Sequence, residues 1–464
     1  MKNLFFILAF FFSCCSAQAQ DITGIWSGIL KVPTGPLTVV FHILKSGDGL
    51  DATMDSPDQG VTGIPVSAIT FESPKLHIEA GNGKIIYDGI LQEDHAIQGT
   101  FKQSGQSFSL DLSRGHTTIK EALRPQEPQK PYPYRSEDIT FENNKAGIQL
   151  SGTLTLPEQE GTFPAAVLIS GSGPQNRDEE ILRHKPFLVL SDYLTRQGIA
   201  VLRFDDRGTA KSGGDFKTAT TADFATDVEA AVAYLKAQKE INTKEIGLIG
   251  HSEGGIIAPM VAAKNKAIAF IVLLAGPGVN GAQVLLMQEE AIGKASGMSS
   301  EAIGKWTHDN RAFFNIIVHS KNEPEMKKNL AKYMESTLPD TFNEEKKKEL
   351  TEITIQKLTT PWPWMLYFLK TDPAVYLEKV RCPVLALGGT HDLQVPAEAN
   401  IAAIKKALKS GGNNEVTTKI FPGLNHLFQQ SATGLPGEYA HIEQTFAPEA
   451  LKEIGDWIVK QISQ

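Results

Sequence analysis

The chain has 464 residues, of which 41% are hydrophobic and 21% charged, and its formal net charge is −8 at pH 7. These proportions are typical of a globular protein and exclude an intrinsically disordered one. Because the charge balance gives no general basic footprint, we expect no nucleic acid among its partners. The length exceeds that of one ordinary core, so we expect two or three packed units.

The first residues have the pattern of a signal peptide. Lys2 precedes the short apolar run Leu4–Phe12, and Ala17–Ala19 forms an A-x-A cleavage site. We therefore predict that residues 1–19 are removed and that the mature chain, from Gln20, is periplasmic or extracellular.

Two alternatives for this segment stay open, a buried N-terminal helix and a lipid anchor at Cys14 or Cys15. Residues 11–13 make a poor lipoprotein box, which counts against the anchor. No later stretch is apolar and long enough to span a membrane. Cys382 is the only cysteine of the mature chain, so no internal disulfide can form, and we interpret it as a buried thiol.

Residues 20–116 are predicted to form a small antiparallel β domain, either a partial barrel or a sandwich. The β-rich runs are 37–44, 68–71, 75–78, 84–91 and 108–112, and glycine-rich turns separate them. His77, His95 and His116 are scattered, so we interpret them as surface or turn residues and predict no metal site. A glycan or a partner protein at this domain stays open.

A proline-rich linker is predicted at 117–135, where four prolines between 125 and 133 favour an extended spacer. The pattern then changes over residues 136–464. Continuous apolar runs alternate with helical patterns, the runs being 165–169, 200–204, 245–249, 270–274 and 384–387. This alternation predicts an α/β domain with a buried, mostly parallel sheet.

The strongest motif is GHSEGG at residues 250–255, between an apolar strand pattern and the helical pattern 256–263. It matches G-x-S-x-G in the strand–turn–helix setting of a nucleophile elbow. The serine must sit on a sharp turn, where side chains at Gly250 and Gly254 would collide with the backbone. We therefore predict that Ser252 is the nucleophile of a serine hydrolase.

With Ile257-Ala258-Pro259 after it, this motif resembles the α/β-hydrolase superfamily, and within it the bacterial carboxylesterases of the EstD type. The resemblance covers about residues 136–464 and not the β domain. It implies an α/β-hydrolase fold with a helical cap, a small-molecule carboxylic ester as substrate, an acyl-enzyme intermediate and no cofactor.

The resemblance also implies an acid and a histidine, in that chain order after the serine. Asp392 lies in the loop after strand 384–387 and matches the acid, and His426 lies in the loop after strand 416–421 and matches the histidine. Imidazole can accept the serine proton near neutral pH, and the carboxylate fixes its tautomer.

Three nearby residues could compete for these roles. His251 and His391 adjoin Ser252 and Asp392, but adjacency along the backbone usually points side chains elsewhere. Glu398 could replace Asp392, although it already lies in the following helix.

Two backbone N–H groups should form the oxyanion hole. One is expected from Glu253, and the family pattern puts the other at Ser172, with Gly171 allowing close approach. Ser170 departs from the histidine that many relatives carry there. A phosphate-binding loop is the rival interpretation of this turn, but no lysine follows where such a loop needs one.

The residues DDRGTAKS at 205–212 resemble the superfamily's D-x-R-G-x-G-x-S loop, with Ala210 replacing a glycine. We interpret this loop as structural, with Arg207 tying loops together by ion pairs.

An insertion at about 277–381 should form the cap, with helical patterns at 283–294, 300–319, 323–335 and 344–357. Aromatic and apolar side chains gather near its end, namely Trp362, Trp364, Met365 and Phe368. They either anchor the cap or form an apolar wall for the substrate, and we predict them as pocket residues.

Ester hydrolysis is the predicted function. An exopeptidase of related fold is one alternative, although no charged grip for a peptide terminus is evident. The other is a binding protein with a vestigial hydrolase unit, which the intact serine, acid and histidine argue against.

Overall fold

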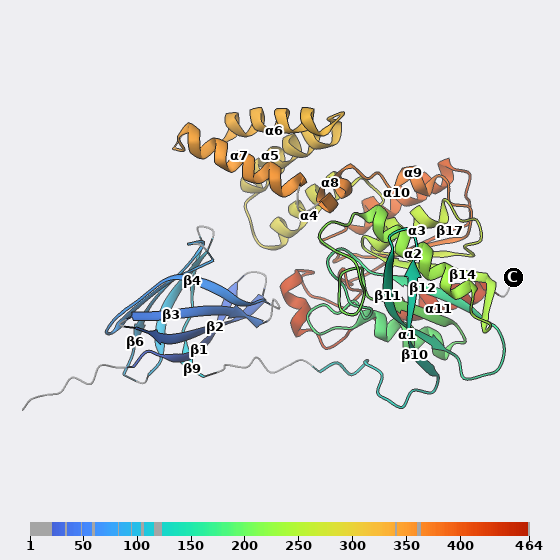
Figure 1. Cartoon of the computed structure of the whole chain (residues 1–464), viewed down its shortest axis with the longest axis horizontal. Helices are drawn as coiled ribbons and strands as arrows, with labels where there is room; N and C mark the ends of the chain where they lie inside the picture. Colours follow the sequence, from blue (N-terminus) through green and yellow to red (C-terminus); the bar gives the residue numbers. More distant parts are fainter. Residues whose placement is uncertain are drawn as a thin grey trace, which may run out of the picture. The chain divides into compact units, whose positions relative to one another are not determined.

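The computed structural model describes residues 21–32, 35–47, 49–57, 61–81, 83–93, 95–103, 106–115, 123–338, 341–359 and 363–462. They divide into two compact units, one within residues 1–120 and one within 121–464 (Figure 1). The predicted signal peptide with Cys14 and Cys15, His116 and Trp362 lie outside the described residues. None of the helices in the described ranges has the length and apolar character needed to cross a membrane.

The described part of the first unit is an antiparallel sheet with the strand order β8-β7-β6-β5-β4-β3-β2-β1-β9. Its strands are β1 (Gly24–Val32), β2 (Gly35–Ser46), β3 (Gly49–Ser56), β4 (Val61–Glu72), β5 (Lys75–Ala80), β6 (Ile85–Leu91), β7 (Ile97–Gln103), β8 (Gln106–Ser109) and β9 (Ser113–Arg114). The segment 106–114 joins both edges, because β8 pairs with β7 and β9 pairs with β1. The sheet is therefore curled like a barrel, one of the two predicted arrangements.

Large side chains fill the inside of this curled sheet. Trp26, Phe41 and Tyr87 are fully buried, and the Tyr87 hydroxyl donates to the main-chain oxygen of Leu110 at 3.0 Å. Gly99 makes room for the Tyr87 ring, since a Cβ atom there would lie 2.4 Å from the Tyr87 hydroxyl oxygen. The interior is a packed core, whose stability comes from burial of apolar surface.

The second unit is built on a sheet with the order β10-β11-β13-β12-β14-β15-β16-β17. The strands are β10 (Arg135–Asn143), β11 (Ile148–Leu156), β12 (Phe163–Ile169), β13 (Ala200–Phe204), β14 (Ile241–His251), β15 (Ile271–Leu274), β16 (Val384–Gly389) and β17 (Val416–Phe421). The pairs from β13 through β17 are parallel, and β10 and β11 run antiparallel at one edge. This is the mostly parallel sheet that the apolar runs predict.

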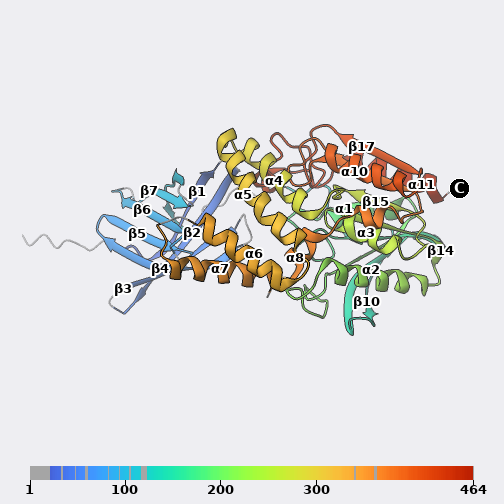
Figure 2. The same cartoon turned by 90° about the horizontal axis from the view of Figure 1, so that it is seen from above.

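Helices cover both faces of this sheet and form a three-layer α/β fold (Figures 1 and 2). One face packs against α2 (Thr221–Lys236), α3 (Gly254–Ala262) and α10 (Ala397–Ser410). The other packs against α1 (Pro186–Arg196) and α11 (Pro448–Ile462). A 3₁₀ helix, η2 (Pro436–His441), precedes α11. The apolar strands are thus covered on both sides, as a parallel sheet requires.

The insertion between β15 and β16 is helical, as predicted. It contains α4 (Gly281–Ala295), α5 (Ser300–His319), α6 (Glu323–Thr337), α7 (Glu344–Thr359), α8 (Pro363–Lys370) and α9 (Ala374–Leu377). Its own small core includes Ile317, Met326, Leu330 and Leu369. Figures 1 and 2 show α5, α6 and α7 as a group set apart from the sheet, with α4 and α8 nearer to it.

Part of the predicted spacer is fastened to the second unit. Arg124 donates to the main-chain oxygens of Ala440 (3.1 Å) and Ile442 (2.8 Å). The Gln126 amide donates to the Phe446 main-chain oxygen at 2.6 Å and accepts from the Phe446 N–H at 3.0 Å. This stretch begins with a turn, in which the Glu127 N–H donates to the Arg124 oxygen at 3.1 Å, and the side chains of Arg124 and Gln126 fasten it to the second unit.

Candidate active site

Ser252 lies on a strained turn between β14 and α3. Its φ of +52° falls in the left-handed region that side chains other than glycine rarely adopt. Both flanking glycines are required for space. A Cβ atom at Gly250 would lie 2.0 Å from the Gly254 oxygen, and one at Gly254 would lie 2.2 Å from the Ile169 oxygen. The sequence therefore folds here as the strand–turn–helix that the motif predicts.

Asp392 and His426 form a buried pair in the loops after β16 and β17. The Asp392 Oδ2 atom lies 2.9 Å from Nδ1 of His426, and the two side chains are 0% and 6% exposed. The Oδ1 atom of Asp392 accepts the N–H groups of Gln394 and Val395, at 2.9 and 2.8 Å. Two backbone donors thus fix the carboxylate and direct its other oxygen to the imidazole.

The His426 loop lies directly against the residue before Ser252. Nε2 of His251 is 2.9 Å from the main-chain oxygen of His426, and the two rings are 4.8 Å apart. Ser252, Asp392 and His426 all follow carboxyl ends of strands, where ligands bind in open α/β sheets. The structure therefore brings the three predicted residues to one edge of the sheet.

The competing residues have other partners. Nδ1 of His251 faces Glu179 at 2.9 Å, and Nδ1 of His391 faces the main-chain oxygen of Ser431 at 2.9 Å. Glu398 is in the first turn of α10, whereas the loop residue Asp392 contacts the His426 imidazole.

The loop after β12 passes close to Ser252. A Cβ atom on Gly171 would lie 3.1 Å from the Ser252 Cβ atom, so only glycine allows this approach without displacement. The Gly171 N–H donates to Glu179 at 2.6 Å and is therefore already engaged. The hydroxyl of Ser170 donates to Asp206 at 2.7 Å, which holds the start of this loop.

The side chain of Glu253, the residue after Ser252, accepts hydrogen bonds from α2 and from α8. Its Oε1 atom accepts from Thr221 Oγ1 and from Trp364 Nε1, both at 2.7 Å. Burial raises the pKa of Glu253 to about 7. The carboxyl group thus links the Ser252 turn to α8 of the cap.

The predicted pocket residues have different surroundings. Trp364 is partly exposed, hydrogen-bonds Glu253 and stacks on Phe368 with a ring distance of 5.2 Å. Phe368 is 6% exposed and packs in the core of the α/β domain. Met365 packs against the small core of the cap. Trp362 lies outside the described residues, so among the described three Trp364 is the one that contacts the residue after Ser252.

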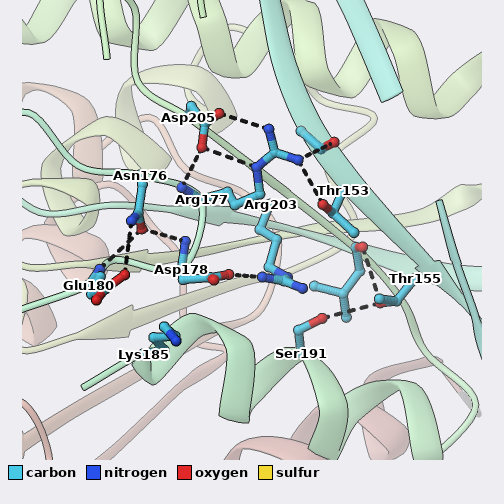
Figure 3. A network of polar contacts seen from close by, with 12 residues as sticks. Thr153, Thr155, Asn176, Arg177, Asp178, Glu180, Lys185, Ser191, Arg203 and Asp205 are labelled. Atoms are coloured by element: carbon cyan, nitrogen blue, oxygen red, sulfur yellow. Dashed lines mark hydrogen bonds and ion pairs between the residues drawn. The ribbon is translucent and has the colours of Figure 1, made fainter. Parts of the chain in front are cut away.

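A network of ion pairs holds the segment that follows the Gly171 loop (Figure 3). Arg177 donates to both oxygens of Asp205 (Nε 3.1 Å, Nη2 2.7 Å) and also to Gly152 and Thr153 of β11. Burial alone would raise the pKa of Asp205, but the hydrogen bonds from Arg177 outweigh it and lower that pKa. Arg203 pairs with Asp178 in the same network.

Arg207 ties neighbouring elements together, as the structural interpretation of its loop predicts. It forms a bidentate pair with Asp227 of α2, with Nε–Oδ2 and Nη2–Oδ1 distances of 2.7 and 2.8 Å.

Within the described ranges, no three His, Cys, Asp or Glu side chains are placed to hold a metal ion. His77, for example, pairs with Asp88 in the first unit.

Sequence reasoning missed Arg177, Glu179 and Asp206. Asp206 lies in the recognised DDRG segment, but nothing there distinguishes it from Asp205. Glu179 is one of three consecutive acids and has a φ of +50°, a conformation that no spacing pattern reports. Only its position, eight residues after Gly171, could suggest that Glu179 lies near that loop.

Comparison with known proteins finds a matching family model, a relative with similar sequence and solved structures that resemble this chain. The family model described as serine aminopeptidase, S33, matches residues 185–430. Esterase EstD of Thermotoga maritima is 26% identical over 337 residues, which cover 71% of this chain and 69% of EstD. An esterase of Pyrococcus furiosus is 18% identical and covers 74% of this chain and 99% of its own, with a TM-score of 0.43.

Est1E of Butyrivibrio proteoclasticus, solved with ferulic acid, is also 18% identical, covering 70% of this chain and all of its own with a TM-score of 0.42. The family match spans more than half of the 464 residues. Together with the sheet order and the strand–turn–helix around Ser252, it shows that this chain belongs to the serine aminopeptidase S33 family of α/β-hydrolases.

Proposed function

We propose that the protein hydrolyses carboxylic esters through an acyl-enzyme on Ser252, with His426 as base and Asp392 as its partner. The observation that carries the proposal is the strained Ser252 turn at the same sheet edge as the buried Asp392–His426 pair. Since Nδ1 of His426 donates to Asp392, Nε2 is the nitrogen available to accept a proton. The similarity to EstD, 26% over 337 residues, supports an ester as substrate.

The reaction has two halves. Nε2 of His426 accepts the Ser252 proton while Oγ bonds to the ester carbonyl carbon, and the carbonyl oxygen becomes an oxyanion. The N–H groups of Glu253 and Ser172 would donate to that oxyanion. The intermediate then expels the alcohol, which takes the proton from His426. In the second half, His426 accepts a proton from water while the water oxygen bonds to the acyl carbonyl carbon. The carboxylic acid is then released as the Ser252 Oγ takes that proton back.

Of the predicted pocket residues, we propose Trp364 as the one that contacts the substrate. Trp364 and Met365 are both partly buried, but the Trp364 indole N–H donates to Glu253, next to Ser252, whereas Met365 packs against the small core of the cap. Phe368 is buried in the core of the α/β domain. We propose that the apolar part of the substrate lies against Trp364, because an apolar wall near the serine favours an acyl chain or aromatic group.

A substrate panel with Ser252→Ala tests this function. The wild-type protein should hydrolyse nitrophenyl esters of several chain lengths, and the Ser252→Ala variant should lose about 10⁴-fold or more in kcat. Matched aminoacyl anilides test the exopeptidase alternative, which faster cleavage of the anilides would support. A folded wild-type protein that cleaves neither class would support the binding-protein alternative.

We also propose that the protein is exported, which rests on the signal-peptide pattern of residues 1–19. N-terminal sequencing of the protein from the exported fraction should begin at Gln20. A cytoplasmic protein that retains Met1 would contradict this.

A further inference from the structure

His251 has a hydrogen-bond acceptor at each ring nitrogen. Nδ1 lies 2.9 Å from Oε1 of Glu179, and Nε2 lies 2.9 Å from the main-chain oxygen of His426. A carbonyl oxygen and an ionised carboxylate can only accept, and a neutral imidazole has a single N–H. Both contacts can be hydrogen bonds with an ionised Glu179 only if His251 is doubly protonated.

The Oε1 atom of Glu179 is placed as an acceptor for a second group besides His251. The same Oε1 atom accepts the Gly171 N–H at 2.6 Å, a short distance of the kind that charged acceptors give. Burial by itself would lower the pKa of His251, but the charge and the hydrogen bond of Glu179 outweigh it and raise that pKa. The side chains of His251 and Glu179 are 6% and 1% exposed, so their contact is buried.

His184 shows the opposite case in the same unit. It is also buried, with Nε2 at 2.8 Å from the main-chain oxygen of Tyr439 and Nδ1 at 3.1 Å from the Thr445 hydroxyl. A hydroxyl can donate as well as accept, so a neutral ring satisfies both contacts. Burial lowers the pKa of His184 to about 4. The carboxylate partner, rather than burial, therefore distinguishes His251.

We infer that Glu179 and a doubly protonated His251 are positioning residues, which tie the Gly171 loop, the Ser252 turn and the His426 loop together. The inference rests on the proposed function, because it assigns the fixed geometry to the Ser252–His426 reaction. His251 holds the main chain of His426 on one side, and Glu179 holds the Gly171 N–H on the other. A small shift of either loop would misalign the serine, the base or the oxyanion donors.

A pH dependence follows from this arrangement. The titratable groups around His251 are Glu179, His426 and Asp392, from three different loops. When His251 loses a proton at alkaline pH, one nitrogen has no hydrogen to donate and one of the two contacts breaks. We expect kcat/KM of the wild-type protein to fall on the alkaline side, without unfolding.

The protonation state can be measured directly on the wild-type protein. Nitrogen-15 NMR of labelled histidines in the wild-type protein, with the His251 ring assigned through bonds from its backbone amide, should show both ring nitrogens of His251 protonated at pH 7. A neutral His251 ring at pH 7 would overturn the inference, whatever the variants do.

Two substitutions test the positioning role. Glu179→Gln keeps the shape but removes the charge, and His251→Gln cannot span both partners. Each should lower kcat by about 10- to 100-fold with little change in KM. His251→Gln should also abolish the alkaline fall in kcat/KM, an effect that a purely structural role would not produce.

His391→Gln is the matched control. His391 also adjoins a proposed catalytic residue, but its Nδ1 contacts the main-chain oxygen of Ser431, five residues after His426, rather than Glu179 or His426 itself. This variant should keep its activity and the alkaline fall. Full kcat in folded Glu179→Gln would overturn the inference, and so would an alkaline fall that persists in His251→Gln.

A failure of the proposed function can be distinguished from a failure of this inference. If wild-type protein hydrolyses no ester or anilide and Ser252→Ala changes nothing, the assignment of the reaction fails, while the NMR measurement still reports on the ion pair. If either variant does not fold, the NMR state and the wild-type pH profile decide the question.

Discussion

Histidine–carboxylate pairs occur in both units, but their surroundings differ. In the first unit, His77 and Asp88 face each other across β5 and β6 with a 2.7 Å contact, and their side chains are 38% and 45% exposed. In the second, the 2.9 Å pair of His426 and Asp392 is 6% and 0% exposed. The distances are similar, so distance alone does not identify a reactive pair.

Burial and neighbouring groups make the difference. Water screens the His77–Asp88 pair on the outer face of its sheet, where such contacts contribute little. The Asp392 carboxylate is instead fixed by two backbone N–H groups, and His426 lies beside the Ser252 turn. The second pair is therefore held in one geometry next to the Ser252 turn, and the described residues of the first unit give His77 and Asp88 no such setting.

The same substitution in both pairs should give the largest contrast. Asp392→Asn keeps the shape but favours the wrong tautomer of His426, so kcat should fall by about 10⁴-fold. Asp88→Asn should change kcat by no more than about twofold, as expected of an exposed site. Steady-state kinetics on one nitrophenyl ester checks both. A nearly silent Asp392→Asn in folded protein would place the acid elsewhere.

The next contrast compares a buried ion pair with an exposed one. Arg177→Met would leave Asp205, whose side chain is 3% exposed, without its cation and should cost about 3–5 kcal/mol of unfolding free energy. Arg135→Met breaks the exposed pair with Glu137 and should cost at most about 1 kcal/mol. Denaturant titrations measure both changes. A loss of no more than about 1 kcal/mol in Arg177→Met would show that the network in Figure 3 adds little stability.

Glu253→Gln should stabilise the protein, and more so at high pH. The raised pKa, about 7, means that folding favours the protonated carboxyl. The stability that it contributes is complete below the usual pKa of 4.5 and is lost as pH rises through about 7. Glutamine accepts the same hydrogen bonds without that cost, which reaches at most about 3 kcal/mol.

Thermal melts of Glu253→Gln and wild type at pH 5 and pH 8.5 test this. The variant should melt above the wild type at pH 8.5 by a wider margin than at pH 5. A margin independent of pH would show that the Glu253 carboxyl does not titrate in this range.

The smallest expected effect is that of removing the first unit. A chain beginning at Glu121 keeps the contacts of Arg124 and Gln126 and should retain kcat/KM within about twofold. A chain beginning at Arg135 loses these contacts and should unfold at lower temperature, since each hydrogen bond contributes about 0.5–1.5 kcal/mol. Loss of activity in the folded longer chain would give the first unit a role in catalysis.

Much of the second unit could be predicted because its signals are local. Each apolar run from 165–169 to 384–387 is a strand, as is the predicted strand 416–421, and Ser252, Asp392 and His426 each follow one of these strands. The partners of His251 could not be predicted. Glu179 lies in an irregular loop with positive φ at residues 179, 182 and 183, where no periodicity applies.

The strands of the first unit are harder to predict, because their sequence signals are weak. The patterns miss β1, β3 and β7, and in β3 only Ala52, Met54 and Ser56 are buried. Two of these three inward residues are small or polar, so the alternating apolar signal of β3 is weak. In the same way, the proline content of 125–133 predicts extension but cannot reveal the side-chain contacts of Arg124 and Gln126.

The central claim, that Ser252 is an activated nucleophile, is tested most directly by covalent labelling. The full-length protein is treated with a fluorophosphonate, digested, and the modified peptide is sequenced by mass spectrometry. One adduct on Ser252 is predicted, absent from Ser252→Ala and formed far more slowly in His426→Ala, because the unassisted hydroxyl is a weak nucleophile. Folded wild-type protein that stays unlabelled, or carries the adduct on another residue, would contradict the account.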